Sequence, residues 1–350
     1  MPTTPIRVLL VEDSPVCLAI LRRMLSSSPE IQVVGTAKNG KEALDLIPNV
    51  QPTVICTDLN MPVMDGLELT REVMIRHPRP ILVVSDYVQK EDTHTVFKLL
   101  EAGAIDVFPK PRGGSESAYE SCAQELITKV KILSGVVVVK RRTTHPRASV
   151  VSDKEQRRSS QSARFRLLVI GASTGGPQAL QAILSCLPAE FPVPIVCVLH
   201  ISEGFLQGLV DWMASLCSMN VKVAGPNEVP QPGTVYFAPE KAHLNFDHHG
   251  RLGYDESLPV AGLRPSIDVT FRAAARVYGG STIGVLLTGM GTDGAEGMLA
   301  IAQAGGLTIA QDERSSIIFG MPKHAINLGA ASHTLPVDKI ASMLIKSVSK

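Results

Sequence analysis

The sequence predicts an α/β protein made of two doubly wound parallel-sheet domains, and three observations support this. Short apolar runs alternate with longer amphipathic stretches, which is typical of strands and helices that succeed one another in a parallel sheet. A basic, Ser-rich stretch interrupts the alternation near the middle of the chain. The length of 350 residues suits two domains. We therefore expect one α/β domain over residues 1–135, a flexible basic linker over 136–164 and a second α/β domain over 165–350.

Composition and charge exclude several classes of protein. Hydrophobic residues make up 45% of the chain and charged residues 19%, which excludes a largely disordered chain. The net charge of +1 offers no overall attraction for nucleic acid or an anionic membrane. No apolar run approaches the roughly 18 residues of a membrane span, and no signal-peptide pattern is present. We expect a cytoplasmic protein without membrane insertion, with no nucleic acid as partner, and with six free cysteines, since none forms a C-x-x-C pair.

The first domain is expected to hold four buried strands, each an apolar run: Ile6–Val11, Val54–Cys56, Ile81–Val84 and Ala104–Phe108. Amphipathic periodicity predicts helices in the segments that separate and follow them: Val16–Ser26, Lys41–Ile47, Leu67–Ile75 and a closing helix from Ser117 to about Leu133.

The basic stretch from Lys140 to Arg166 has almost no aliphatic periodicity. It carries nine Lys and Arg residues, opposed only by Asp153 and Glu155. Such a segment cannot bury enough apolar surface to order itself, so it is interpreted as a linker. A nucleic-acid-binding segment is the less favoured alternative, because linkers are often basic for solubility alone.

The second domain repeats the alternation. Five apolar runs are strand candidates: Arg166–Ile170, Ile195–Leu199, Thr234–Ala238, Ile283–Thr288 and Leu307–Ala310. Helical periodicity covers five further segments: Gln178–Leu187, Gly204–Ser218, Ile267–Val277, Gly294–Ala304 and Pro322–Leu328.

Acidic side chains follow two strands of the first domain, where functional groups of an open parallel sheet gather. Glu12 and Asp13 come after the first strand, and Asp58 follows the next one. Three converging carboxylates need a cation among them, and hard oxygen ligands suit Mg²⁺. Ser85 and Lys110 end two further strands and supply a hydroxyl and an ammonium group for a phosphoryl group. The alternative, that the acids only cap turns and helices, explains one of them better than the whole set.

This set resembles the receiver domain of bacterial two-component signalling over roughly residues 5–130. The resemblance rests on Val11-Glu12-Asp13-Ser14, the run from Thr57 to Gly66 (TDLNMPVMDG), Ser85 and Lys110-Pro111. It implies a flavodoxin-like fold, with Asp58 as the phospho-acceptor and Ser85 and Lys110 contacting the phosphoryl group. It also implies a sensor histidine kinase of the chemotaxis type as phosphodonor, and Mg²⁺ held by Glu12, Asp13, Asp58 and the backbone carbonyl of Asn60.

A glycine-rich turn follows the first strand of the second domain. Gly171-Ala172-Ser173-Thr174-Gly175-Gly176-Pro177 contains the pattern G-x-S-x-G, in which small residues permit a sharp turn that exposes the Ser173 hydroxyl. The helix that follows directs free N–H groups towards the same place. A phosphate cradle is the structural alternative. The spacing, however, fits neither G-x-G-x-x-G nor a P-loop, since no Lys follows the glycines.

A serine nucleophile needs a base and an orienting acid. His200 ends the second strand of this domain, and Asp293 lies in a glycine-rich loop after the strand that begins at Ile283. Alone, His200 suits a packed residue and Asp293 a helix N-cap. Together with Ser173 they fall at the carboxyl ends of strands of one sheet, which favours a triad. The chain order Ser, His, Asp differs from the Ser, Asp, His order of an α/β-hydrolase.

The second domain resembles the catalytic domain of the bacterial chemotaxis protein-glutamate methylesterases over about residues 165–348. The resemblance rests on the Ser173 turn, His200 and two motifs, Arg264-Pro265-Ser266-Ile267-Asp268 and Leu287-Thr288-Gly289-Met290-Gly291-Thr292-Asp293-Gly294. Ile201-Ser202 departs from the Met-Pro pair expected after the base. The order receiver, linker and Rossmann-like methylesterase domain matches the architecture of that enzyme family.

That resemblance assigns roles to the residues of the second domain. Ser173 is the nucleophile, His200 the base, Asp293 the orienting acid and the Met290 backbone N–H an oxyanion donor. Four side chains are expected along the substrate cleft: Thr174, His243, Arg264 and Ser266. The activity implied is phosphorylation-activated hydrolysis of glutamate methyl esters on the cytoplasmic helices of chemoreceptors, which releases methanol, together with deamidation of receptor glutamines. Ester hydrolysis of this kind needs no cofactor.

Three other functions remain open on the residues alone. They are nucleotide binding at the Gly171 turn, a non-catalytic adaptor, and DNA binding by the second domain. The triad argues against the adaptor, and the domain lacks a recognition helix with clustered Arg and Lys.

Overall fold

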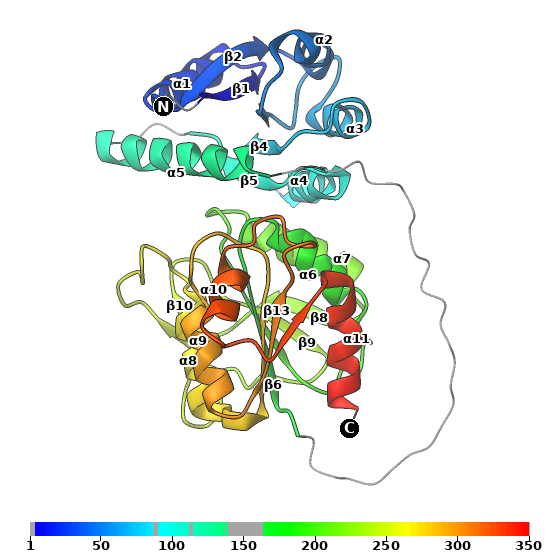
Figure 1. Cartoon of the computed structure of the whole chain (residues 1–350), viewed down its shortest axis with the longest axis vertical. Helices are drawn as coiled ribbons and strands as arrows, with labels where there is room; N and C mark the ends of the chain where they lie inside the picture. Colours follow the sequence, from blue (N-terminus) through cyan, green and yellow to red (C-terminus); the bar gives the residue numbers. More distant parts are fainter. Residues whose placement is uncertain (1–3, 87–89, 112–114, 137, 139–163, 350) are drawn as a thin grey trace.

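The computed structural model in Figure 1 describes residues 4–86, 90–111, 115–136, 138 and 164–349. It contains two parallel sheets covered by helices on both faces, so the predicted α/β class is confirmed. The predicted linker over 136–164 lies outside the described residues, apart from 136, 138 and 164.

The first sheet has the order β2-β1-β3-β4-β5 with every pair parallel. Its strands are β1 (Ile6–Val11), β2 (Ile31–Ala37), β3 (Val54–Thr57), β4 (Ile81–Ser85) and β5 (Asp106–Pro109). The helices of this domain are α1 (Pro15–Ser26), α2 (Gly40–Val50), α3 (Gly66–Arg76), α4 (Lys90–Ala102) and α5 (Glu116–Ser134). Helices α1 and α5 pack on one face and α2, α3 and α4 on the other.

Local capping chemistry starts four of these helices. The side chains at their N-caps accept a backbone N–H from the first turn, which satisfies a donor that the helix itself cannot pair. These N-caps are Ser14, Asn39, Asp65 and Ser115. Because each cap follows the carboxyl end of a strand, helix starts and functional loops share one edge of the sheet.

The second sheet has seven parallel strands in the order β14-β13-β12-β6-β7-β9-β8. They are β6 (Leu167–Ala172), β7 (Ile195–Leu199), β8 (Asn220–Val223), β9 (Thr234–Phe237), β12 (Thr282–Leu286), β13 (Leu307–Gln311) and β14 (His333–Leu335). A separate antiparallel hairpin joins β10 (His243–Phe246) to β11 (Leu252–Asp255). The chain starts in the middle of the sheet at β6, adds strands on one side, and then crosses to β12 on the other.

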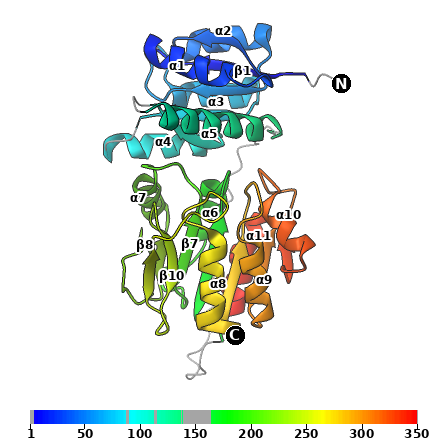
Figure 2. The ribbon, with the colours of Figure 1, turned by 90° about the vertical axis from the view of Figure 1, so that its left-hand side faces the viewer.

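Helices cover both faces of this sheet (Figure 2). They are α6 (Gly176–Leu184), α7 (Leu206–Leu216), α8 (Ile267–Tyr278), α9 (Ala295–Gln303), α10 (Met321–Asn327) and α11 (Val337–Val348), with a short 3-10 turn, η1, at Gly279–Ser281. Helices α6, α7 and α11 belong to one apolar cluster and α8, α9 and α10 to the other.

The two domains touch through the α4, β5 and α5 side of the first domain, which faces the second domain in Figures 1 and 2. Helix α4 packs against α7, where the rings of Phe97 and Trp212 stack. Trp212 Nε1 donates to Glu101 Oε1 at 3.0 Å, and Gln178 Nε2 donates to the carbonyl of Ala104 at 2.8 Å. The contact therefore combines an aromatic pair with polar groups, like other inter-domain interfaces.

Candidate active site and phosphorylation site

Ser173 lies on a tight turn between β6 and α6. The six residues of β6 are all buried, so the nucleophile candidate leaves a rigid strand. Gly175 has a φ of +76°, and a Cβ there would lie 2.7 Å from Ile317 Cδ1, so this turn requires glycine. Helix α6 begins at the next residue, Gly176. Sequence and backbone geometry therefore agree on the predicted strand–turn–helix around Ser173.

Strand register brings the other two triad candidates to the same edge. Ala172 pairs with Leu199 across β6 and β7, and the His200 N–H donates to the Ala172 carbonyl at 3.0 Å. The Ser173 N–H donates to the carbonyl of Thr288, after β12, at 3.0 Å. Strands β7 and β12 flank β6, where the strand order reverses, and open α/β sheets bind ligands at that switch point.

His200 and Asp293 form a direct pair. His200 Nε2 lies 2.9 Å from Asp293 Oδ2, with the side chains 12% and 7% exposed. With Nε2 turned to the carboxylate, Nδ1 is the ring nitrogen left to accept a proton. No hydrogen bond within the described residues joins the Ser173 hydroxyl to His200, which is common before substrate tightens a site.

The Asp293 carboxylate is saturated with donors. Besides His200, three groups at the start of α8 donate to it: the Ser266 hydroxyl at 2.8 Å, the Ile267 N–H at 2.7 Å and the Asp268 N–H at 3.0 Å. Burial alone raises the pKa of Asp293, but the hydrogen bonds from His200 and the backbone outweigh it and lower that pKa. The N-cap of α9 is Gly294, which has no capping side chain, so Asp293 is not a cap of that helix.

Met290 is the oxyanion donor candidate in the loop after β12. A Cβ on Gly289 would lie 2.6 Å from Ser173 Cβ, so this backbone passes directly beside the nucleophile. The side chain of Met290 is 52% exposed, and its N–H makes no hydrogen bond within the described part of the chain. An unpaired N–H beside a nucleophile suits an oxyanion hole.

Two of the four predicted cleft residues do not line a cleft. His243 and Ser266 are 0% exposed. His243 Nδ1 accepts the Ser266 N–H at 3.0 Å, and its Nε2 contacts the Leu258 carbonyl at 3.3 Å. Ser266 points to Asp293 instead of solvent. The prediction of cleft positions for this pair is wrong, because a sequence pattern does not distinguish a buried polar residue from one that faces an open cleft.

The other two predicted cleft residues lie near the boundary with the first domain. Thr174 is buried, and its hydroxyl makes a long contact, 3.5 Å, with Asp106 Oδ2 of β5. Arg264 is exposed and lines a polar cavity of about 360 Å³ together with Ser202, Glu240 and Glu125 of α5. The Ser202 hydroxyl donates to Glu125 Oε1 at 3.2 Å. The structure thus adds Asp106 and Glu125 to the surroundings of the site, and no local sequence signal marks them.

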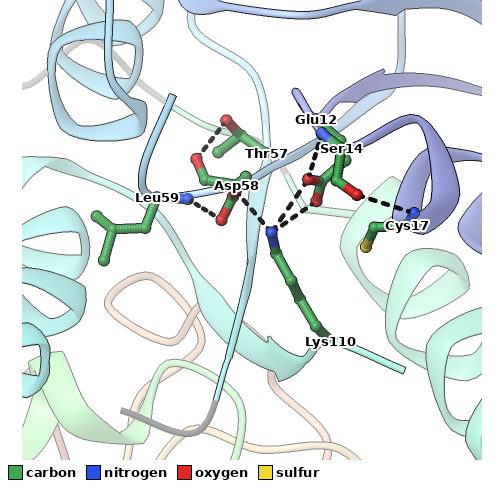
Figure 3. A network of polar contacts seen from close by, with 7 residues as sticks. All are labelled: Glu12, Ser14, Cys17, Thr57, Asp58, Leu59 and Lys110. Carbon is green, nitrogen blue, oxygen red and sulfur yellow. Dashed lines mark hydrogen bonds and ion pairs between the residues drawn. The ribbon is translucent and has the colours of Figure 1, made fainter. Parts of the chain in front are cut away.

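Figure 3 shows part of the acidic pocket of the first domain, with Glu12 and Asp58 directed at Lys110. Glu12, Asp13 and Asp58 each bring a carboxylate oxygen within 4.8 Å of the others. Lys110 Nζ lies between two of them, 2.7 Å from Asp58 Oδ2 and 3.0 Å from Glu12 Oε2. Ser85 ends β4 and is buried, and its carbonyl accepts the Lys110 N–H at 2.8 Å.

Electrostatics of this pocket suit a divalent cation. Burial raises the pKa of Asp58 to about 6, although the hydrogen bond from Lys110 opposes the rise. Burial also lowers the pKa of Lys110, but the hydrogen bonds and charges of Asp58 and Glu12 outweigh it and raise that pKa. Among the described residues, buried Glu12 Oε2 has no hydrogen-bond partner, although Lys110 Nζ lies 3.0 Å away. Three acids facing one ammonium group leave an excess of negative charge that Mg²⁺ fits.

None of the helices in the described ranges is both long and apolar enough to cross a bilayer.

Comparison with known proteins gives two family matches. Residues 168–344 match the model of the CheB methylesterases, and residues 8–117 match the response regulator receiver domain. The chain is 43% identical over 344 residues to protein-glutamate methylesterase/protein-glutamine glutaminase 2 of Methanospirillum hungatei, covering 97% of each chain. It is 42% identical to the protein of that activity from Nitrosospira multiformis, covering 99% of this chain and 98% of the relative.

A solved structure resembles the second domain. The catalytic domain of the Thermotoga maritima CheB methylesterase is 40% identical and superimposes with a TM-score of 0.51. The match covers 52% of this chain and 98% of that structure.

Proposed function

Because this chain belongs to the CheB family of receiver-linked protein-glutamate methylesterases, we propose that it hydrolyses glutamate γ-methyl esters of chemoreceptors through Ser173, His200 and Asp293. The observation that carries the residue assignment is the His200–Asp293 pair, set beside Ser173 by strand register. The same site deamidates receptor glutamines, the second activity in the names of the relatives. The substrates are the cytoplasmic helices of the receptors, so the enzyme works on the cytoplasmic side.

Ester cleavage starts with attack of the Ser173 oxygen on the ester carbonyl while His200 Nδ1 takes the hydroxyl proton. Asp293, ionised and fixed by its donors, stabilises the imidazolium that forms. Collapse of the tetrahedral intermediate breaks the carbon–oxygen bond to the methoxy group, which leaves as methanol with the proton from His200. A water molecule, deprotonated in turn by His200, then releases the glutamate from Ser173.

Charge on the carbonyl oxygen is the main barrier to that attack. The Met290 N–H, which makes no hydrogen bond within the described residues, is the donor assigned to the oxyanion. Gly289 lets this loop approach Ser173, because any side chain there would collide with the Ser173 Cβ and with Met321 Sδ. In this mechanism a backbone N–H stabilises the oxyanion.

The receiver domain supplies control. Asp58 is the phospho-acceptor, with Ser85 and Lys110 placed to contact the phosphoryl group and a histidine kinase of the chemotaxis type as donor. Glu12, Asp13, Asp58 and the Asn60 carbonyl would hold Mg²⁺, which supplies positive charge for phosphoryl transfer to Asp58. Asn60 follows Leu59, whose N–H already fixes Asp58 Oδ1 at 2.6 Å.

The unphosphorylated receiver restrains the active site. Asp106 contacts Thr174, the residue after the nucleophile, and Glu125 binds Ser202, two residues after the base. Ser202 stands where the family resemblance led us to expect proline, and its hydroxyl gives the receiver a hydrogen-bond partner there. These contacts place α5 and β5 over the edge of the sheet that carries the triad.

The nucleophile assignment is tested by Ser173→Ala in the intact chain. Methanol release from methylated receptor membranes should fall by several orders of magnitude, because triad members act as a unit. Ser185→Ala is the matched control, since Ser185 is exposed at the end of α6 and its hydroxyl donates only to Gln181. A fluorophosphonate probe should label the control but not Ser173→Ala. Near-normal methanol release from Ser173→Ala would refute the assignment.

A further inference from the structure

The orienting acid of the proposed triad is itself oriented by the start of α8. Each oxygen of Asp293 has two donors: Oδ2 accepts from His200 and the Ile267 N–H, and Oδ1 accepts from the Ser266 hydroxyl and the Asp268 N–H. Two of these donors are backbone N–H groups, which side-chain truncation leaves in place. Among the residues that the structure describes, Ser266 provides the single side-chain donor besides the base.

Ser266 is more than an N-cap of α8. Its hydroxyl accepts the Val269 N–H at a long 3.4 Å, whereas its contact with Asp293 Oδ1 is 2.8 Å. A hydroxyl has one proton, and that proton goes to Asp293, because the carboxylate can only accept while the Val269 N–H donates. The side chain therefore joins a helix start to the carboxylate, with no exposure to solvent.

Buried His243 holds Ser266 in that place. Its Nδ1 accepts the Ser266 N–H at 3.0 Å, so this nitrogen carries no proton, and Nε2 then donates to the Leu258 carbonyl at 3.3 Å. Both ring nitrogens are used, and the residue is 0% exposed. The His243 imidazole thus links strand β10, in which it lies, to Ser266, the N-cap of α8.

We propose that Ser266 is a positioning residue of the esterase, which locks Asp293 Oδ1 so that Oδ2 faces His200, and that His243 fixes Ser266 for this task. Without the hydroxyl, the carboxylate keeps three donors, and within the described residues Oδ1 is held by the Asp268 N–H alone. This inference rests on the proposed function, because it assumes that Asp293 orients the base.

The test compares Ser266→Ala, Ser266→Gly and Ser266→Thr in the full-length protein, with methanol release measured from methylated receptor membranes. Glycine preserves N-cap propensity without a hydroxyl, and threonine keeps the hydroxyl. Ser115→Ala is the control: it removes the capping hydroxyl of an exposed helix start in the receiver, far from Asp293 in the sequence and without contact to it.

The Ala and Gly variants should lose about 10-fold to 100-fold in kcat, by analogy with the loss of hydrogen-bond partners that orient metal ligands, while KM stays unchanged. The acid limb of the kcat/KM profile should move to higher pH, because a carboxylate with fewer donors attracts the imidazolium more strongly. The other titratable groups around Asp293, which are His200, Asp268 and His243, are untouched. Threonine should restore most of kcat.

Wild-type kcat in Ser266→Gly would overturn the proposal. So would an unshifted pH profile, or a threonine variant no faster than glycine, because each shows that the hydroxyl acts only as a cap. Failure here is distinct from failure of the proposed function. If Ser173→Ala abolishes turnover while Ser266→Gly does not, the esterase assignment stands and only the positioning role falls.

Discussion

The ring of Phe97 in the receiver stacks on the indole of Trp212 in the methylesterase domain, with centroids 5.2 Å apart and planes 17° from parallel. Both side chains are almost fully buried, and Trp212 is the only tryptophan of the chain. Its Nε1–H is satisfied by Glu101 at 3.0 Å. This pair anchors α4 on α7, so it holds the receiver against the methylesterase domain.

Phe97→Ala should therefore raise the basal esterase activity. Aromatic pairs are worth about 0.5–1.5 kcal/mol beyond their buried area, so the open state should gain roughly 2-fold to 10-fold in population. Methanol release without phosphodonor measures the gain. Ile75→Ala, a truncation at a position of α3 that is 64% exposed, should change nothing. Equal activity in Phe97→Ala and wild type would show that this contact does not restrain the enzyme.

Glu125→Ala should also raise the basal esterase activity, because it removes a different contact between the domains. It removes the acceptor of the Ser202 hydroxyl close to the base, and a single hydrogen bond contributes about 1 kcal/mol. Basal turnover should rise by about 5-fold. Glu120→Ala, also exposed on α5, is the matched control. An unchanged rate in Glu125→Ala would mean that Ser202 does not mediate the restraint.

Long apolar runs made the centre of both sheets predictable. Strand β7 was delimited correctly from Ile195 to Leu199 because its five residues are all buried. Edge strands were missed for the opposite reason: β2 mixes buried and exposed positions, and β14 has no buried residue. Helix α11 was also missed. A half-solvated strand lacks the continuous apolar signal that a central parallel strand carries.

The candidate site shows the same contrast: some of its features follow from local sequence, and others depend on contacts between segments that are distant in the sequence. The placement of Ser173, His200 and Asp293 at one edge of the sheet could be predicted, because each follows an identifiable strand and all such ends meet there. The burial of His243 and Ser266 could not be predicted, because it depends on the β10–β11 hairpin and α8, which approach only in three dimensions. Contacts of Asp106 and Glu125 with the second domain are likewise invisible in the sequence.

Asp293→Asn should destabilise the methylesterase domain in a pH-dependent way. Asparagine replaces one carboxylate oxygen by an N–H₂ group, which then faces two of the four donors, and losing hydrogen bonds to a charged group costs about 2–3 kcal/mol. The folded-state pKa of Asp293 lies below the ordinary value of 3.8, so its contribution is complete above that pH and is lost as pH falls through the lower folded value.

Urea unfolding at several pH values measures the difference between Asp293→Asn and wild type. It should be constant from pH 7 to about 5 and shrink below about 4, as the wild-type carboxylate is protonated. Asp338→Asn, at an exposed position in the first turn of α11, serves as control. A difference that stays the same at pH 3 would contradict an ionised Asp293.

Mg²⁺ should stabilise the receiver domain. Burial raises the pKa of Asp58 to about 6, and a divalent cation favours the ionised form and offsets the excess of carboxylates. At ten times Kd, binding adds about 1.4 kcal/mol to the free energy of unfolding. Thermal melts with and without Mg²⁺ should show this in wild type and in the surface control Asp45→Asn, but much less in Asp13→Asn. An equal shift in Asp13→Asn would place the ion elsewhere.

Phosphorylation of Asp58 should separate the domains, because Lys110 beside it directly follows the strand that contacts the second domain. The phosphoryl group brings close to two negative charges to Asp58, 2.7 Å from the ammonium of Lys110. Lys110 directly follows β5, and that strand carries Asp106 and the Val107 carbonyl, which contact Thr174 and Ser202 of the methylesterase domain. A shift of Lys110 towards the phosphoryl group therefore displaces the backbone that covers the active-site edge.

Acetyl phosphate with Mg²⁺ should then raise methanol release and move Trp212 emission to longer wavelength, because the indole loses its packing on Phe97. Asp58→Asn should show neither response and keep a low rate. Removal of residues 1–160 should give a fast enzyme that ignores acetyl phosphate. A truncated enzyme no faster than the unphosphorylated full chain would show that the receiver contacts do not occlude the site. Such a result would leave the triad assignment unchanged. It would mean that the phosphorylated receiver activates the enzyme directly, instead of uncovering its active site.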